Sequence, residues 1–197
     1  DNPIKVFDYI TEAIKETPHV SQSDIRFGID ASGDNLHISN NLLSDYYSRL
    51  INHYQLLYLE DPYKENDLNN WSKIFKEYGN KLNIVGDDLT VTNSQRIKQF
   101  ASAKNINGVI IKPNQIGTIS SAIDAVRTAK TLSLKVIVSH RSGETNDCFI
   151  ADFAIGVEAD GVKFGAPVRG ERVAKYNRLL KIEESLLHKS KYGINNL

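Results

Sequence analysis

The sequence has no methionine, a single cysteine and no excess of charge of either sign among its 197 residues. One cysteine excludes an internal disulfide and is typical of a reducing compartment, so we expect a cytoplasmic protein. The 24 basic and 24 acidic residues balance, which gives no electrostatic reason to expect a nucleic-acid partner. No apolar run approaches the roughly 18 residues of a membrane span, so we expect no membrane partner.

The missing methionine also bears on the extent of the chain. An open reading frame starts with methionine, whereas this chain begins at Asp1 and contains none. Its first residues lack the charged-then-apolar pattern of a signal peptide. We therefore expect a fragment or a processed product of a longer protein. Cys148 lies in a helix-like segment, where a small buried side chain is a better interpretation than a nucleophile.

What the sequence does contain is a repeated pattern. Six times, a short apolar run ends in a charged or titratable residue and is followed by a helix-like stretch, at intervals of 23 to 30 residues. Each interval accommodates one strand, one loop and one returning helix. We therefore predict an α/β fold, a partial TIM-like barrel of about six βα units that forms one domain over residues 1–197. A closed barrel has about eight strands, so the domain is expected to be incomplete.

The strand-end residues are Asp30, Glu60, Asp87, Lys112, His140 and Lys163. The apolar runs predict buried strands, and periodic apolar residues predict helices between them. The predicted strands cover 25–30, 55–61, 82–88, 108–112, 134–140 and 161–165. The predicted helices include one over 145–157, one capped by Thr92 or Asn93, and three with apolar faces made of Phe7, Ile10 and Ile14, of Ile119, Ile123 and Val126, and of Val173, Tyr176 and Leu180.

Parallel strands joined by right-handed crossovers bring their C-terminal ends to one face, where α/β enzymes place their sites. Three carboxylates, from Asp30, Glu60 and Asp87, would meet there. Oxygen ligands without His or Cys favour Mg²⁺ over Zn²⁺. Asp88 adjoins Asp87, but by strand alternation only one of the two faces inward, and we favour Asp87. A lone acidic residue at a strand end is also a common helix cap, which is the alternative interpretation for each carboxylate.

The two lysines follow buried strands, where an ammonium is costly unless it is paired with carboxylates or loses its proton. Lys112 is therefore a candidate base, although a structural salt bridge is an alternative for either lysine. In the segment VSHRSGET, His140, Arg141 and Ser142 offer an imidazole, a planar guanidinium suited to phosphate and a hydroxyl. The other histidines are interpreted as surface residues: His19, His37, His53 and His188.

Together these segments resemble the C-terminal barrel domain of the enolase (phosphopyruvate hydratase) family. The resemblance runs in order through YLEDPY (58–63), GDDLTVTN (86–93), IKPNQIGT (111–118), VSHRSGETND (138–147), KFGAP (163–167) and ERVAKYNRLLKIEE (171–184), with a weaker match at FGID (27–30). Pro113 and Gly170 depart from residues common in the family, but neither replaces a side chain that the chemistry requires.

The resemblance implies a role for each strand-end residue. Asp30, Glu60 and Asp87 match magnesium ligands, with Glu60 also near the substrate. Lys112 matches the base that removes the C2 proton of 2-phosphoglycerate, and Lys163 matches the lysine beside the substrate carboxylate. His140 corresponds to a substrate-contacting histidine, whereas Arg141 and Ser142 correspond to phosphate-binding residues. A magnesium-dependent lyase of glycolysis with a small-molecule substrate is the implied activity.

The acid that helps hydroxide leave in this family lies upstream of the matching region, as does a smaller N-terminal domain. The resemblance thus implies that the barrel domain is incomplete at its N-terminal side. We therefore expect little or no activity from this chain alone, and a homo-oligomer for the full-length protein. Two other functions stay open: a non-catalytic enolase homologue with a structural or binding role, and a superfamily dehydratase of sugar acids. The preserved lysines and carboxylates argue against the first, and the phosphate-suited SHRSGET segment argues against the second.

Overall fold

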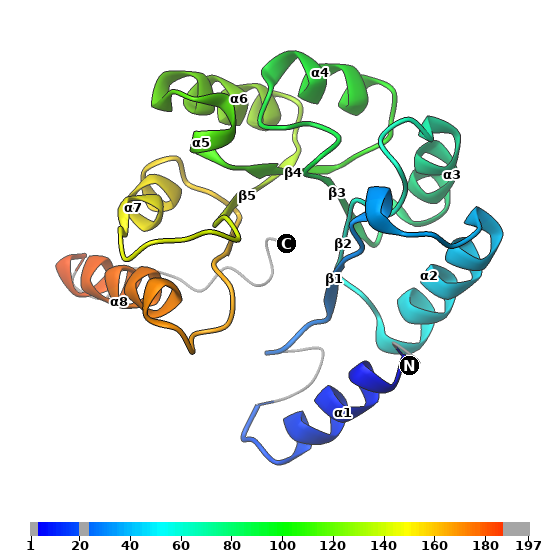
Figure 1. Ribbon diagram of the computed structural model, residues 1–197, viewed down its shortest axis with the longest axis horizontal. Coiled ribbons are helices and arrows are strands. Elements are labelled where there is room, and N and C mark those ends of the chain that lie inside the picture. The colour runs from blue at the N-terminus through cyan, green and yellow to red at the C-terminus, as the bar shows by residue number, and fades with distance from the viewer. Residues whose placement is uncertain (1–3, 20–23, 187–197) are drawn as a thin grey trace. The chain divides into compact units, whose positions relative to one another are not determined.

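A computed structural model describes residues 4–19 and 24–186 of the chain. Six strands follow one another in the sheet in chain order, β1 to β6, and every described pairing is parallel. Each strand is followed by helix before the next strand begins (Figure 1). The predicted α/β class with consecutive parallel βα units is therefore confirmed. The chain forms two compact units, Asp1–Val85 and Gly86–Leu197.

The strands are short. They are β1 (Gly28–Asp30), β2 (Tyr58–Glu60), β3 (Asn83–Gly86), β4 (Gly108–Ile111), β5 (Lys135–Ser139) and β6 (Gly161–Lys163). The helices are α1 (Ile4–Lys15), α2 (Asn40–Tyr54), α3 (Leu68–Tyr78), α4 (Ser94–Ser102), α5 (Pro113–Ile116), α6 (Ile119–Thr131), α7 (Phe149–Gly156) and α8 (Gly170–Ser185), with a 3₁₀ turn, η1, at Gly33–Asn35.

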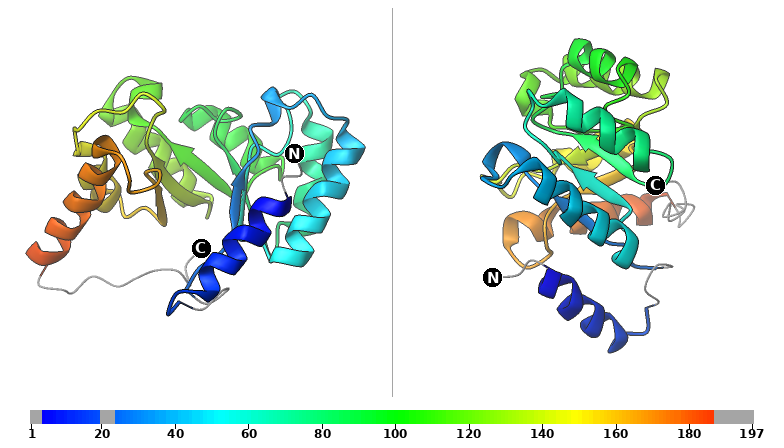
Figure 2. Two further views of the ribbon diagram at one scale, coloured as in Figure 1. Left: turned by 60° about the horizontal axis from the view of Figure 1, so that its bottom comes forward. Right: turned by 90° about the vertical axis from the view of Figure 1, so that its right-hand side faces the viewer.

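In the first unit, helices α2 and α3 cover one face of the strands (Figures 1 and 2). The register pairs Asp30 with Glu60 and Glu60 with Val85, so these strands end at the same level. Trp71 on α3 is fully buried and donates its indole N–H to the Lys64 carbonyl at 3.1 Å. Burial of such a large ring fixes the helix against the sheet.

In the second unit, β4, β5 and β6 pair in parallel register, and α4 and α6 pack against each other. The face that α6 buries is made mainly of small side chains, Ala122, Ala125 and Ala129, with Val126. Ile119, which the apolar period assigned to that face, is 42% exposed. Val126 was thus predicted correctly and Ile119 was not, since alanine methyl groups allow the helix to approach the sheet closely along a face that large apolar residues do not mark.

Other boundaries also differ from the sequence prediction. Strand β1 has only three residues and is not buried, because Gly28 and Asp30 are both exposed. Helix α7 begins at Phe149 and not at 145, since the Asp147 carboxylate accepts the Phe149 N–H at 2.8 Å and fixes a turn before it. Cys148 is the cap of α7 and is half-buried, so it is not an interior core residue.

Two predicted helical faces are partly wrong. In α1, Phe7 and Ile14 are buried but Ile10 is exposed. In α8, Leu180 is exposed. Of the described residues of α8, the buried one is a charged residue, Lys175, whose side chain is fully enclosed. The spacing of apolar residues therefore did not predict this face of α8, because the burial of Lys175 depends on an ion pair that is described below.

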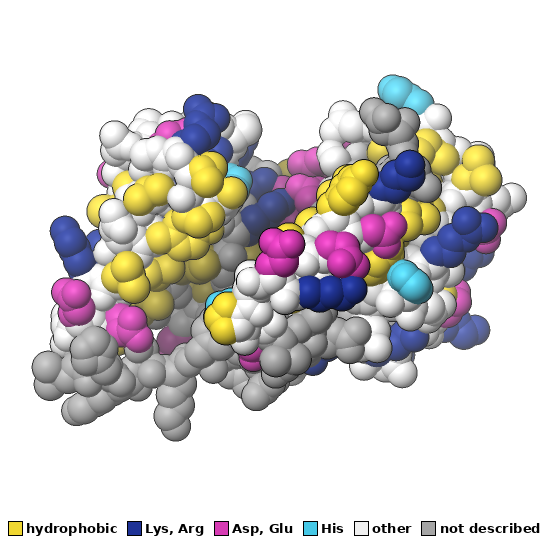
Figure 3. Space-filling model, turned by 90° about the horizontal axis from the view of Figure 1, so that it is seen from below, with side chains coloured by type: hydrophobic (Ala, Val, Ile, Leu, Met, Phe, Trp, Pro, Cys, Tyr) yellow, Lys and Arg dark blue, Asp and Glu magenta, His cyan; other side chains and the backbone are white. Residues whose placement is uncertain are grey.

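The surface carries charges of both signs. Figure 3 shows Lys and Arg side chains interspersed with Asp and Glu side chains on the viewed face, together with exposed apolar side chains. Among the residues that the structure describes, no helix is both long enough and apolar enough to cross a bilayer.

Candidate functional site

The first acidic residues of the site come from the end of β2. Leu59 anchors this strand in the core with no exposed surface, and Glu60 follows it, also fully buried. The Tyr58 hydroxyl donates a hydrogen bond to the Glu60 carboxylate. The chain then turns at Asp61, whose φ of 42° lies in the left-handed region. This turn ends strand alternation, so two consecutive carboxylates are both buried.

The third carboxylate, Asp87, directly follows β3 and is 6% exposed, whereas Asp88 is exposed. The predicted choice between these two neighbours is therefore consistent with their burial. The segment after Asp87 is compact, because the Asp87 carbonyl accepts the N–H groups of Thr90 and Val91 at 3.1 and 2.8 Å. Asn93 then caps α4 by accepting the N–H groups of Gln95 and Arg96.

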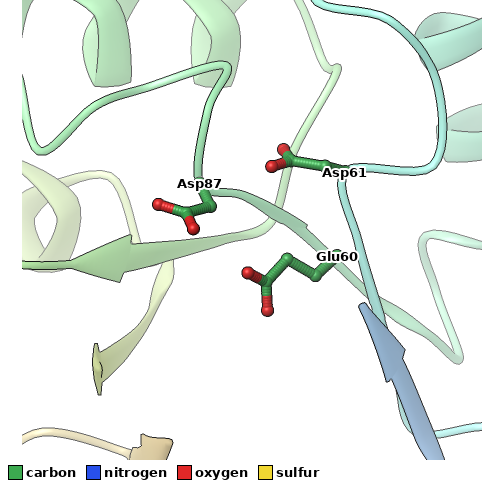
Figure 4. A group of neighbouring side chains, drawn as sticks. All are labelled: Glu60, Asp61 and Asp87. Carbon is green, nitrogen blue, oxygen red and sulfur yellow. The ribbon is translucent and has the colours of Figure 1, made fainter. Parts of the chain in front are cut away.

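Carboxylate oxygens of Glu60, Asp61 and Asp87 lie within 4.8 Å of one another, and we call these three residues the carboxylate cluster (Figure 4). In Figure 4, Glu60 and Asp61 extend from the end of β2 and Asp87 from the end of β3. Three buried like charges at this separation repel one another strongly unless cations lie among them. A set of hard oxygen donors of this kind fits Mg²⁺.

Asp30 was predicted as a ligand but is not part of this cluster, which contains Asp61 instead. Asp30 is exposed, and its carboxylate accepts the Ser32 N–H at 3.2 Å. It nevertheless pairs in register with Glu60 on the adjacent strand. The sequence argument gave Asp61 no role, although the following Pro62 was an available signal that the strand ends there.

Lys112 lies at the end of β4, and its ammonium forms an ion pair with the Asp87 carboxylate. The two side chains are 14% and 9% exposed. The Lys112 backbone N–H donates to the Thr92 hydroxyl at 2.9 Å, and that hydroxyl in turn donates to the Gln115 side chain at 2.8 Å. The structure therefore brings the predicted base to a member of the carboxylate cluster and holds its backbone in place.

The segment after β5 contains His140, Arg141 and Ser142. His140 is half-buried, its backbone N–H donates to the Lys163 carbonyl at 2.9 Å, and its Nδ1 is buried without a hydrogen-bond partner in the described part of the chain. Burial lowers the pKa of His140, and the charges of Arg172 and Lys163 lower it further. The imidazole is therefore mainly neutral at pH 7. Arg141 and Ser142 are both exposed.

Lys163 ends β6, beside Ser139 in the ladder, and is half-buried. In the second unit the structure thus places Lys112, His140 and Lys163 at the ends of β4, β5 and β6, as the sequence pattern predicted. Of the remaining histidines, His19, His37 and His53 are exposed as expected, and His188 lies outside the described residues.

Sequence reasoning gave no role to Glu144, Arg172 and Lys175, although the segment that contains the last two contributed to the family resemblance. The structure places all three around the segment that follows β5. Lys175 contacts Glu144, and Arg172 donates to the carbonyls of Arg141 and Ser142. A usable signal was a pair of basic residues three positions apart on α8, facing one side of the helix.

Comparison with known proteins supports the family resemblance seen in the sequence. The family model for the enolase C-terminal TIM barrel domain matches residues 7–197. Enolases of Sulfurisphaera tokodaii, Aeropyrum pernix and Ehrlichia ruminantium are 44%, 40% and 41% identical to this chain. These matches cover 95%, 93% and 92% of the chain. The chain spans only 45% or 46% of the length of those enolases. The fold, the order of the strand-end residues and the similarity to these relatives all agree. This chain therefore belongs to the enolase family and corresponds to its C-terminal TIM barrel domain.

Proposed function

We propose that the full-length protein is a phosphopyruvate hydratase, which converts 2-phosphoglycerate reversibly to phosphoenolpyruvate and water with Mg²⁺. The single observation that carries the proposal is the ion pair of Lys112 with Asp87, a member of the buried carboxylate cluster. It provides an amine and a set of metal-binding oxygens in direct contact, as proton abstraction next to a carboxylate requires. The enolase superfamily is itself a standard example of a lysine base that works with magnesium.

Glu60 and Asp87 are proposed to hold the metal, with Asp61 or Asp30 as the third carboxylate. Asp61 has the support of the cluster geometry, and Asp30 that of the family resemblance. Bound Mg²⁺ supplies positive charge that stabilises the second negative charge on the substrate carboxylate when the C2 proton leaves.

The remaining roles belong to this chain's own side chains. Lys112 Nζ takes the proton from C2, and the C–H electron pair delocalises into the substrate carboxylate. Lys163 offsets the charge that develops there. Hydroxide then leaves from C3 as the C2–C3 double bond forms. Arg141 and Ser142 bind the phosphate, and the mainly neutral His140 contacts the substrate as a hydrogen-bonding group.

The direct test is turnover of 2-phosphoglycerate by the full-length protein with Mg²⁺. Lys112→Met removes the amine and should lower kcat by at least about 100-fold, since a positioned general base contributes roughly 10²- to 10⁴-fold. Lys98→Met on the exposed surface of α4 is the matched control and should leave kcat unchanged. Absence of turnover in the unaltered protein would contradict the proposal and favour a non-catalytic homologue, and turnover of a sugar acid alone would favour the dehydratase.

The proposal also includes a small-molecule partner, a glycolytic role and a cytoplasmic homo-oligomer. The enolase names of the relatives support the first of these. Mass measurement of the full-length protein in solution checks the oligomer, because a monomer at micromolar concentration would contradict it.

A further inference from the structure

We propose that Lys175 of α8 is a positioning residue that holds the phosphate-binding segment in place through Glu144, with Arg172 as a second support. This inference rests on the proposed function, because it concerns the same site, and it explains how an exposed segment is kept in one conformation. We call residues 140–145 the anion loop.

Lys175 is the centre of the arrangement. Its side chain has no exposed surface, and Nζ donates to the Thr145 carbonyl at 2.6 Å and to the Glu144 carboxylate at 2.6 Å. A buried ammonium is costly unless it is paired and hydrogen-bonded. Both contacts of Lys175 are with the anion loop, so its burial requires that loop to remain where it is.

Glu144 transmits this constraint to Arg141. Its Oε1 accepts the Arg141 backbone N–H at 2.9 Å, while its Oε2 faces Lys175. Burial alone would raise the pKa of Glu144, but the hydrogen bonds from Lys175 and Arg141 outweigh it and the pKa is lowered. Glu144 is therefore ionised at neutral pH and forms charge-assisted hydrogen bonds on both sides.

Arg172 completes the support from the first turn of α8. Its guanidinium donates to the Arg141 carbonyl at 2.9 Å and to the Ser142 carbonyl at 3.2 Å. Both backbone polar groups of Arg141 are therefore fixed, the N–H by Glu144 and the carbonyl by Arg172. The Arg141 side chain is exposed, and its guanidinium donates a long hydrogen bond of 3.5 Å to the Asn114 side-chain oxygen. A fixed backbone with an accessible guanidinium suits a phosphate ligand.

This geometry predicts a particular kinetic effect. The phosphate is not the reacting group, so it is bound about equally in the ground state and in the transition state. Loss of such uniform binding raises KM and leaves kcat unchanged. A residue that merely stabilised the fold would instead lower the amount of active protein.

The chain offers a matched control on the same helix. Arg178, three positions after Lys175, forms an ion pair with Asp152 of α7, at 2.8 Å from Nε. This pair also fixes α8, by joining it to α7, but within the described residues it does not involve the anion loop. Comparing Lys175→Met with Arg178→Met therefore separates positioning of the loop from attachment of the helix.

In the full-length protein, Lys175→Met and Glu144→Gln should raise KM for 2-phosphoglycerate about tenfold or more, since displacements near 1 Å cost up to about 100-fold. The value of kcat should stay within about threefold. Hydrogen exchange of the Arg141 amide should become about tenfold faster, because its acceptor is displaced. Arg178→Met should change none of these quantities. Equal effects of Lys175→Met and Arg178→Met, or an unchanged Arg141 amide, would overturn the inference.

A double variant covers the case in which Lys175→Met alone fails to fold. Glu144→Leu with Lys175→Met removes both charges and should recover much of the thermal stability, since a buried pair can be replaced by apolar residues. KM should stay high because the acceptor for the Arg141 amide is still missing. Recovery of KM together with stability would contradict a positioning role. Hydrogen exchange of the Arg141 amide can be measured without turnover, so it tests the positioning role separately from the proposed function. If the unaltered protein were inactive but Lys175→Met still exchanged this amide faster, the proposed function would be refuted and the positioning role would be retained.

Discussion

The carboxylate cluster and the anion loop are built in different ways. Glu60, Asp61 and Asp87 are 0%, 4% and 6% exposed, and they end or directly follow strands whose ladder fixes their backbone. Arg141 and Ser142 are exposed, and side chains of another helix hold their backbone. The proposed metal ligands are thus placed by the sheet, whereas the proposed anion ligands are placed by a separate set of side-chain contacts. Substitutions within the cluster should therefore act on the bound ion directly, and those around the loop should act at a distance.

The largest expected effect is on the cluster. Glu60→Gln should lower the Mg²⁺ affinity of the full-length protein by at least about 100-fold, because loss of an outer hydrogen-bond partner alone costs about 10- to 100-fold. Titration calorimetry with Mg²⁺ measures this. Asp61→Asn and Asp30→Asn distinguish the two candidates for the third ligand, since only the true ligand should show a comparable loss. Asp88→Asn, at the exposed neighbour, is the control and should have almost no effect.

The second-largest expected effect is a loss of stability on substitution of Gly165, which lies beside the anion loop. Its φ is +78°, and an added Cβ would lie 3.2 Å from both Arg172 Cδ and His140 Cε1. Gly165→Ala should therefore lower the free energy of unfolding by about 1 to 3 kcal/mol, measured by chemical denaturation. Gly143→Ala is the matched control, because no atom lies within 4 Å of its added Cβ. Equal free energies of unfolding for Gly165→Ala and Gly143→Ala would contradict this prediction.

A smaller effect is the response of stability to acid. The folded-state pKa values of His140 and Glu144 are both lowered, from 6.5 and 4.5. Groups of this kind contribute stability above their unfolded pKa, and the contribution is lost as pH falls through the folded pKa. The free energy of unfolding should thus decline below about pH 6.5 and again below about pH 4.5. His140→Gln should remove the first decline and Glu144→Gln the second, whereas His37→Gln should remove neither.

The smallest expected effect is on Ser142. Its side chain is exposed, so Ser142→Ala should change the free energy of unfolding by less than about 0.5 kcal/mol. Under the proposed function the same variant should raise KM for 2-phosphoglycerate. A large loss of stability would mean that the loop depends on its own side chains, and the contrast between cluster and loop would no longer hold.

The parts of the site that follow buried strands could be predicted from the sequence. Glu60, Asp87, Lys112 and His140 each end an apolar run, and strand ends of parallel units gather at one face. Asp61 was missed because the argument took one strand-end residue from each unit, whereas the turn at Asp61, with its positive φ, buries a second carboxylate next to Glu60. The weakness of β1 was missed as well, since Gly28 and Asp30 are exposed in a run that appeared buried.

Residues placed by tertiary contacts could not be found by periodicity. The face of α8 was predicted from Val173, Tyr176 and Leu180, yet Lys175 is the buried residue there. A hydrophobic period cannot anticipate a lysine whose partner, Glu144, is remote in the sequence. Similarly, α6 presents alanines and not Ile119 to the strands, because close approach selects small side chains there.

The enclosed Lys175–Glu144 pair has a consequence for how such a chain can change over generations. Loss of either residue alone leaves the other as a buried charge with no counterion, which costs far more than most single substitutions. The two positions should therefore vary together or not at all when related sequences are compared. A lineage that replaced one of them would need its compensating change almost at once, so this part of the chain should diverge more slowly than its exposed neighbours.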